Sequence, residues 1–175
     1  MKKNLGKFVS GARSEMRMKT SRISLTRLSA EGGSAFGGKI KTKSIKQVVL
    51  LNAPPAEVYD MLMDSKKHGA FTGSPARISR KIDGTFTAYD GWIKGKNLKL
   101  TPNRLIIQEW RGDDWPKGYY SKAMFLLSKH PRGTKLTFGQ TGIPVEFYAD
   151  IKGGWKTEYW DKMKKMIAEQ KKKAA

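Results

Sequence analysis

Apolar and polar residues alternate along the middle of the chain in the way that is typical of β-strands. Segment 134–142 shows this well, because Leu136 and Phe138 alternate with polar neighbours, as in an antiparallel strand with one buried face. Turn-forming pairs such as Asp83-Gly84 and Pro102-Asn103 separate such segments. The pattern predicts seven strands, over residues 45–51, 76–82, 85–89, 92–100, 104–111, 120–129 and 134–142.

Two short helices are predicted between the first two strands. Pro55 suits the first turn of a helix over residues 56–63, because proline lacks the N–H that a first turn leaves unpaired. Asp64 follows directly and can cap a second helix that ends near Ala70.

The period of the sequence changes after Pro144. Apolar side chains then recur every four residues, which predicts a long amphipathic C-terminal helix with one large apolar face. Gly153-Gly154 marks a place where this helix can kink. The apolar stripe consists of Ile151, Trp155, Tyr159, Met163 and Ile167, widened by Trp160 and Met166.

The order of these elements predicts an α+β fold. A strand, two short helices, six antiparallel strands and a long helix follow one another without β–α–β alternation, which disfavours a Rossmann fold. The economical way to bury the apolar stripe is to lay the helix across the concave face of a curved sheet of about seven strands.

Residues 1–43 differ in composition from the rest of the chain. They contain eleven basic and two acidic residues, and they end in a Gly-rich stretch over residues 31–38. We therefore expect a basic, flexible N-terminal tail over residues 1–43 and one folded domain over residues 44–175. The tail is either a basic arm of a cytoplasmic protein, which we prefer, or an organellar transit peptide.

The whole chain of 175 residues carries a formal net charge of +20, with 26 Lys and 9 Arg. Such a charge favours either weak, sequence-independent binding to polyanions or simply a well-solvated surface. The absence of Cys excludes disulfides and thiol catalysis. No apolar run reaches the roughly 20 residues that a transmembrane helix needs, so no transmembrane segment is predicted.

The candidates for chemistry are weak. Gly33–Lys39 has the spacing of a phosphate-binding loop but lacks the following Ser or Thr and the strand–loop–helix setting. Asp64 and His68 stand four residues apart with no placed nucleophile, and Asp113-Asp114 fall in a loop. We therefore expect no enzymatic activity, no metal site and no cofactor.

Aromatic residues occur on nearly every predicted element. Most of them must belong to the core, yet a sheet wrapped around a helix often leaves a cleft with aromatic walls. The residues that we expect around an apolar cavity under the C-terminal helix are Tyr59, Phe71, Trp92, Trp110, Trp155 and Tyr159.

Over residues 44–170 the chain resembles the activator of heat shock protein 90 ATPase homologue-like family (C-terminal domain type). This family belongs to the START-like (SRPBCC, helix-grip) superfamily, whose fold agrees with the predicted order of elements. The motifs that carry the resemblance are Phe71-Thr72-Gly73, Gly91-Trp92-Ile93-Lys94-Gly95, Gln108-Glu109-Trp110-Arg111, Trp115-Pro116 and Gly154-Trp155.

The resemblance implies several functions, and it supplies no catalytic residue. Superfamily members bind lipids, hormones or polyketides under the long helix, and some are cyclases. Eukaryotic co-chaperones of this type stimulate the ATPase with a separate N-terminal domain, for which residues 1–43 are expected to be too short and too polar. We expect a non-enzymatic domain that binds an apolar small molecule or acts as a chaperone-linked accessory protein. The alternatives are a basic protein that binds nucleic acid or ribosomes non-specifically and, last, a hydrolase or cyclase.

Overall fold

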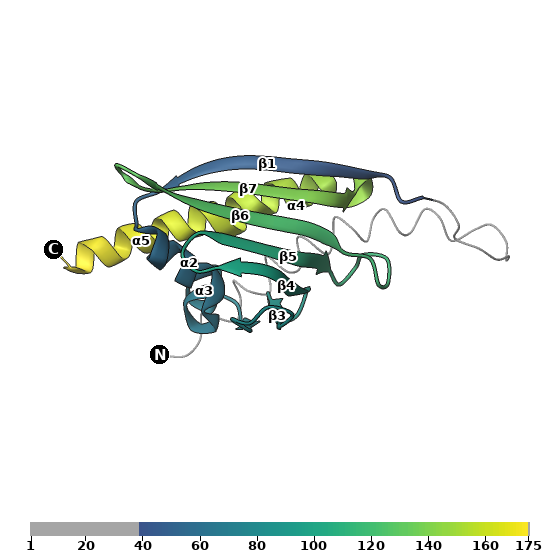
Figure 1. Cartoon of the computed structure of the whole chain (residues 1–175), viewed down its shortest axis with the longest axis horizontal. Coiled ribbons are helices and arrows are strands. Elements are labelled where there is room, and N and C mark those ends of the chain that lie inside the picture. Colours follow the sequence, from purple (N-terminus) through teal and green to yellow (C-terminus); the bar gives the residue numbers. More distant parts are fainter. Residues whose placement is uncertain (1–38, 175) are drawn as a thin grey trace, which may run out of the picture.

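The computed structural model describes residues 39–174, which form a seven-stranded antiparallel sheet and a long C-terminal helix (Figure 1). The strands lie in the order β1-β7-β6-β5-β4-β3-β2, which confirms the predicted α+β helix-grip fold. The strands are β1 (Thr42–Leu51), β2 (Arg77–Ile78), β3 (Thr85–Ala88), β4 (Ile93–Thr101), β5 (Leu105–Gly112), β6 (Ser121–His130) and β7 (Gly133–Pro144). The helical elements are α2 (Pro55–Met63), α3 (Ser65–Thr72), η1 (Val145–Phe147), α4 (Tyr148–Gly154), η2 (Trp155–Trp160) and α5 (Asp161–Ala174).

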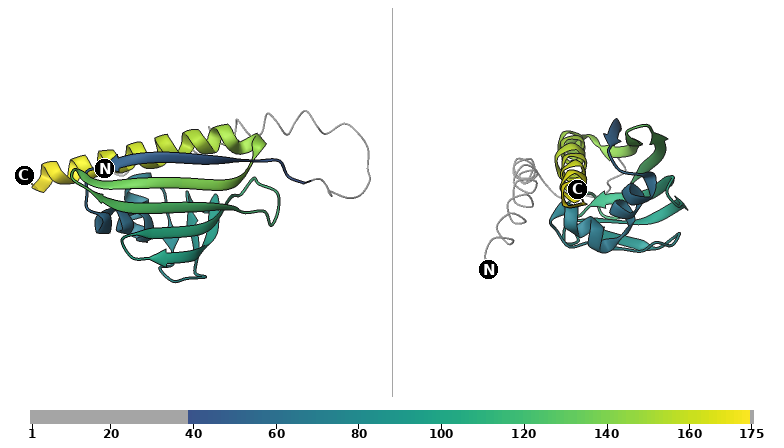
Figure 2. Two further views of the ribbon diagram at one scale, coloured as in Figure 1. Left: turned by 45° about the horizontal axis from the view of Figure 1, so that its top comes forward. Right: turned by 90° about the vertical axis from the view of Figure 1, so that its left-hand side faces the viewer.

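The C-terminal helix, made of α4, η2 and α5, lies on the inner side of the curved sheet (Figure 2). Inward-facing strand residues such as Leu136 and Phe138 are fully buried beneath it. The short helices complete this core, because α2 packs on β6 and β7 while α3 packs on α5. None of the helices between residues 39 and 174 is long and apolar enough to cross a bilayer.

The middle of the C-terminal helix is a π-helical segment, η2. A straight α-helix has 3.6 residues per turn, so a stripe with a four-residue period drifts by about 40° at each step and by roughly 160° over four steps. The wider turn of a π-helix removes much of this drift. All five residues of the stripe, from Ile151 to Ile167, are consequently buried, with exposed fractions of 6% or less.

The two short helices begin as predicted, and α3 runs to Thr72, two residues beyond its expected end near Ala70. Pro55 occupies the first turn of α2. The Asp64 carboxylate accepts hydrogen bonds from the backbone N–H groups of Lys66 and Lys67, at 3.0 and 2.9 Å, which confirms its role as the cap of α3. Gly73 ends α3 in the left-handed region, with a φ of 72°, where a side chain would be strained.

Most element boundaries agree with the sequence-based expectation to within two residues, and two differ by more. Thr42 and Lys43, which we assigned to the tail, pair with Pro144 and Ile143 of β7 and therefore belong to the sheet. The strand expected over residues 76–82 is reduced to Arg77 and Ile78. The cause is the amide of Asn97, which donates to the carbonyls of Ser79 and Lys81 and so occupies acceptors that a strand would use.

The turn between β3 and β4 is strained. Tyr89, Asp90 and Gly91 have φ angles of 51°, 54° and 85°, so three consecutive residues lie in the left-handed region. This conformation is unusual for a bulky residue such as Tyr89 and persists only where the surroundings hold it. Contacts to the C-terminal helix, described below, supply that restraint.

Candidate functional site

The space between the sheet and the C-terminal helix is filled by an aromatic cluster centred on Trp155. The Trp155 ring lies 4.3 Å from that of Phe138 on β7 and 4.4 Å from that of Tyr159, measured between centroids. Trp110 on β5 and Phe125 on β6 follow at 5.9 and 5.6 Å. Trp155 itself is 3% exposed. Tilted and edge-on rings at these distances attract one another beyond simple burial, so the cluster joins three central strands to the helix.

A chain of buried hydrogen bonds orients Trp155. The indole N–H donates to Gln140 Oε1 at 2.6 Å, the Gln140 amide donates to Ser121 Oγ at 2.8 Å, and Ser121 donates to the Trp110 carbonyl at 2.9 Å. Gln140 is fully buried, so its amide would be costly without these partners. Sequence reasoning missed Gln140, although it shares the inward parity of Leu136 and Phe138 on the same strand.

Two small cavities lined by described residues lie between the sheet and the helices, each of about 20 Å³. Each is little larger than the space that one water molecule needs, whereas pockets for small organic ligands usually measure about 300–1,000 Å³. A wider groove of about 410 Å³ opens to solvent beside Ser65, Arg77 and Thr85, and polar and apolar atoms contribute about equally to its walls. At these two places, side chains of described residues thus fill most of the space under the helix.

The six residues that we expected around a ligand cavity are only partly brought together. Trp110, Trp155 and Tyr159 line both small cavities, and the half-buried Trp92 lines one of them. The other two line neither. Tyr59 lies under the Arg80 guanidinium, 5.8 Å from ring centroid to Cζ, and Phe71 packs on Tyr159 with centroids 5.7 Å apart.

His68 lines one of the two cavities and is 5% exposed. Its Nδ1 lies 3.2 Å from the Leu62 carbonyl, while no described residue is a hydrogen-bond partner for its Nε2. Burial lowers the pKa of His68 from 6.5 to about 4, which keeps the ring neutral at pH 7. His68 makes no hydrogen bond to Asp64, because its Nδ1 contacts the Leu62 carbonyl and the Asp64 carboxylate caps α3, so these two residues do not form an acid–base pair.

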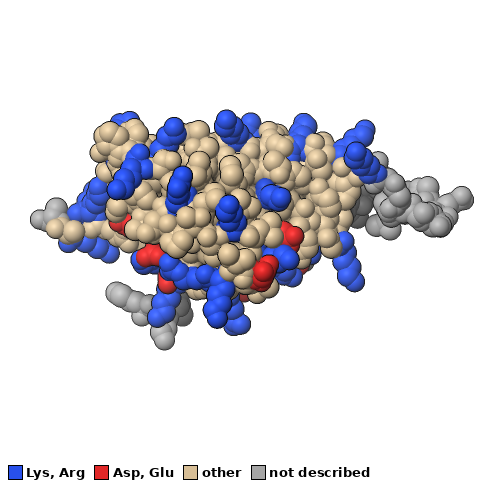
Figure 3. Space-filling view, in the orientation of Figure 1, with Lys and Arg blue, Asp and Glu red and all other residues tan. Residues whose placement is uncertain are grey.

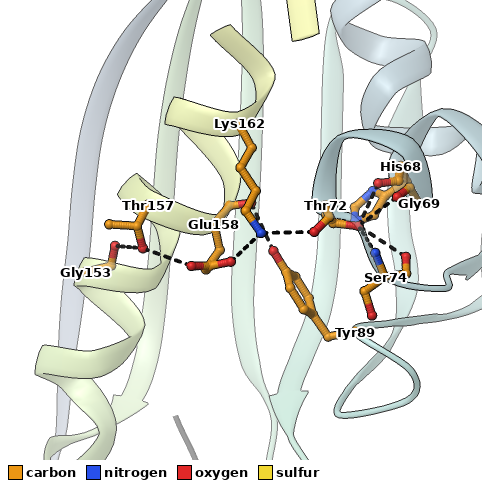
Figure 4. A network of polar contacts seen from close by, with 9 residues as sticks. All are labelled: His68, Gly69, Thr72, Ser74, Tyr89, Gly153, Thr157, Glu158 and Lys162. Carbon is orange, nitrogen blue, oxygen red and sulfur yellow. Dashed lines mark hydrogen bonds and ion pairs between the residues drawn. The ribbon is translucent and has the colours of Figure 1, made fainter. Parts of the chain in front are cut away.

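A polar network ties η2 to the strained turn and to the end of α3 (Figure 4). The Lys162 ammonium lies 2.6 Å from the Glu158 carboxylate and donates to the Thr72 carbonyl at 2.9 Å. The Tyr89 hydroxyl donates to the Glu158 carbonyl at 2.9 Å, and burial raises the pKa of that hydroxyl well above its usual value. This network holds Tyr89 in its unfavourable backbone conformation and closes the side of the aromatic cluster.

The other candidates from the sequence do not form a catalytic arrangement. Asp113 makes an exposed ion pair with Lys94 at 2.7 Å. Gly33–Gly38 lies outside the described residues. Between residues 39 and 174, no three acidic or His side chains cluster as a metal site would require.

Comparisons with curated proteins find relatives that are named as activators of a 90 kDa heat shock protein ATPase. The chain is 33% identical to the activator of 90 kDa heat shock protein ATPase homolog of Dictyostelium discoideum, over 72% of this chain and 33% of that protein. It is 27% identical to the human activator of 90 kDa heat shock protein ATPase homolog 1, over 73% of this chain and 38% of that protein. The chain therefore spans about a third of the length of these curated relatives.

A solved structure shows the same fold. An HSP90 activator from Plasmodium falciparum superposes with a TM-score of 0.65 at 21% identity, over 73% of this chain and 96% of that one. The family model described as "Activator of Hsp90 ATPase homolog 1-like protein" matches residues 52–168, which include α2, the sheet from β2 to β7 and most of the C-terminal helix. The chain belongs to the activator of Hsp90 ATPase homolog 1-like family.

Proposed function

We propose that this protein is a non-enzymatic accessory of a 90 kDa heat shock protein, which it binds through its surface. The observation that carries the proposal is the family match over residues 52–168, together with curated relatives that are named as activators of that chaperone's ATPase. Because the chain spans about a third of those relatives, we assign binding to it first and expect any effect on the ATPase to follow from binding.

The filled interior supports a surface function over ligand binding. The two cavities that described residues line, of about 20 Å³ each, leave no room for a lipid or a polyketide unless the aromatic cluster moves apart. Such a movement would break the buried bonds of Gln140 and separate rings as close as 4.3 Å. The binding free energy of an apolar ligand would have to exceed the free energy lost by both changes.

The charge of the chain favours an acidic partner. The formal net charge of +20 attracts any acidic surface and speeds encounter, while the fit of the two surfaces sets the lifetime of the complex. We therefore expect binding whose association rate falls with added salt and whose dissociation rate changes little.

The test uses the full chain and a purified 90 kDa heat shock protein. Binding is measured by titration calorimetry at two salt concentrations, and the steady-state ATPase rate of the chaperone is followed across the same titration. We expect saturable binding and a change in the ATPase rate that saturates at the same ratio. An unrelated basic protein of similar size and charge serves as the control for non-specific attraction.

Two results would contradict the proposal. The first is no binding at low salt. The second is binding that the basic control protein reproduces, because that result would reduce the interaction to net charge. A parallel titration with single-stranded RNA tests the polyanion alternative, for which tight, salt-sensitive RNA binding without chaperone binding is the expected pattern.

A further inference from the structure

The outer face of the sheet, away from the helix, carries a group of aliphatic side chains. Their positions follow from the strand register, which sets Leu126 opposite Leu105 and Met124 opposite Ile107, while Val48 and Leu126 both lie opposite Thr137 of β7. Val48 is 60% exposed and the others are partly exposed. We call this group the outer patch; it consists of Val48, Leu105, Ile107, Met124 and Leu126.

This patch is unexpected on a face of the sheet that none of the helices between residues 39 and 174 covers. The solvent face of an antiparallel sheet is normally polar, and the inner face of this sheet already supplies the core. Gly139 lies next to the patch, opposite both Lys46 and Met124. A methyl group at residue 139 would have its nearest neighbour, Met124 Cε, 3.8 Å away, so packing does not require a glycine at this position.

Lysines surround the outer patch. Lys46 flanks it on β1, Lys99 lies opposite Ile107, and Lys122 and Lys135 project from β6 and β7. All four are exposed, and none makes an ion pair with another residue of the described part. Figure 3 shows this face, with Lys and Arg spread over it and Asp and Glu confined to the lower half of the view.

An apolar centre with a charged rim is the usual anatomy of a protein–protein interface. We propose that the outer patch and its four lysines form the surface on which the 90 kDa heat shock protein docks, an inference that rests on the function proposed above. The partner surface should be acidic at its border and should present aliphatic side chains at its centre. Met124 suits such a contact, because a flexible thioether adapts to an irregular surface.

The chemistry of the patch favours a protein over a nucleic acid. Proteins that bind single strands without sequence preference stack bases on aromatic rings, and none of the five patch residues is aromatic. The Phe and Trp residues of the central strands β5, β6 and β7, which are Trp110, Phe125 and Phe138, are instead buried on the inner face.

The experiment compares two charge-reversed variants of the full chain. Lys46→Glu/Lys135→Glu reverses two lysines beside the patch. Lys164→Glu/Lys165→Glu reverses two exposed lysines of α5, on the other side of the sheet, and changes the net charge by the same amount. We expect the first variant to bind the chaperone about tenfold more weakly than the unaltered chain, or worse, and the second to stay within about threefold.

A third variant tests the apolar centre without any change in charge. Met124→Ser/Leu126→Ser should weaken binding at least as much as the charge reversal, and circular dichroism should show an unchanged fold because both side chains point outward. If it fails to fold, Val48→Ser alone provides the same test at the 60% exposed position, with a loss of about threefold or more expected.

The outcomes separate the two proposals. If the unaltered chain does not bind the chaperone, the proposed function and the docking surface both fail. If it binds and the patch variants bind equally well, or if the α5 variant loses as much, only the docking surface is wrong. A parallel measurement uses vesicles of phosphatidylserine and phosphatidylcholine. If the patch variants lose the vesicle binding of the unaltered chain but still bind the chaperone, the outer patch is a membrane surface and the inference is overturned.

Discussion

The hydrogen bond between Trp155 and Gln140 allows a quantitative test of how the C-terminal helix is held. Trp155→Phe keeps an aromatic ring in the cluster but removes the N–H, so Gln140 Oε1 is left buried without its donor. An orphaned buried polar group costs about 1–3 kcal/mol, and the smaller ring adds a packing loss. We therefore expect Trp155→Phe to lower the free energy of unfolding by about 2–4 kcal/mol.

The reverse change, Gln140→Leu, orphans the indole N–H of Trp155 and should cost about 1–3 kcal/mol for the same reason. The double variant Trp155→Phe/Gln140→Leu removes both the donor and the acceptor of this bond, so neither is left buried without its partner. Its loss should therefore be smaller than the sum of the two single losses by about 1–2 kcal/mol. The free energy of unfolding of a domain of this size is about 5–15 kcal/mol, so the variants should remain folded at 25 °C.

The assay is urea unfolding followed by far-UV circular dichroism, because the substitution changes the Trp fluorescence itself. Trp160 and Gln47 form a matched control pair, with the same 2.6 Å bond from indole N–H to amide oxygen but with Gln47 partly exposed. Water can replace a lost partner there, so their coupling should be below about 0.5 kcal/mol. Additive losses for Trp155 and Gln140, within about 0.3 kcal/mol, would refute the reasoning.

Three further predictions concern single positions. The pKa of His68 is lowered from 6.5 to about 4, so between these values the unfolded chain binds a proton that the folded chain does not, and stability should fall as the pH drops. Between pH 7 and pH 5, the free energy of unfolding in urea should fall by about 2 kcal/mol more for the unaltered chain than for His68→Leu, and parallel pH profiles would disprove this. Asp64→Ala removes the cap of α3 and should cost about 1 kcal/mol by the same assay, whereas an unchanged midpoint would mean that the cap adds nothing. Lys162→Met leaves Glu158 without its ion pair and should speed amide exchange at the Tyr89 turn more than in α2, and equal exchange in both regions would contradict a local role.

The sequence predicted the number of strands, the two short helices and the buried stripe of the C-terminal helix, because each depends on a local period or cap. Gln140 was predictable in principle, because it lies two residues after Phe138 on β7 and so points to the same buried face of the sheet. The length of β2 was not predictable in this way, since the amide of Asn97 ends that strand from 16 or more residues away. Whether an aromatic residue lines a cavity or fills it depends on the rotamers of all its neighbours, which no spacing records.

The same limit explains the mixed outcome for the candidate site. Trp110, Trp155 and Tyr159 meet because they lie on β5 and on the inward stripe of the helix. Tyr59 sits on the face of α2 that is next to Arg80, and Phe71 lies on α3 against Tyr159, so burial alone did not distinguish them from cavity residues.

The π-helical segment has a consequence for changes in chain length. A π-turn amounts to one additional residue in an α-helix, placed so that the helix on either side keeps its orientation. Removing one exposed residue from this segment, such as Lys156 or Thr157, would convert it to ordinary α-helix and leave Ile151 and Met163 facing the sheet. Removing Lys164 would instead rotate every following residue by about 100° and turn Ile167 out of the core. Homologous chains that differ by a single residue between Trp155 and Trp160 can therefore share this fold, whereas a gap farther along α5 should not be tolerated.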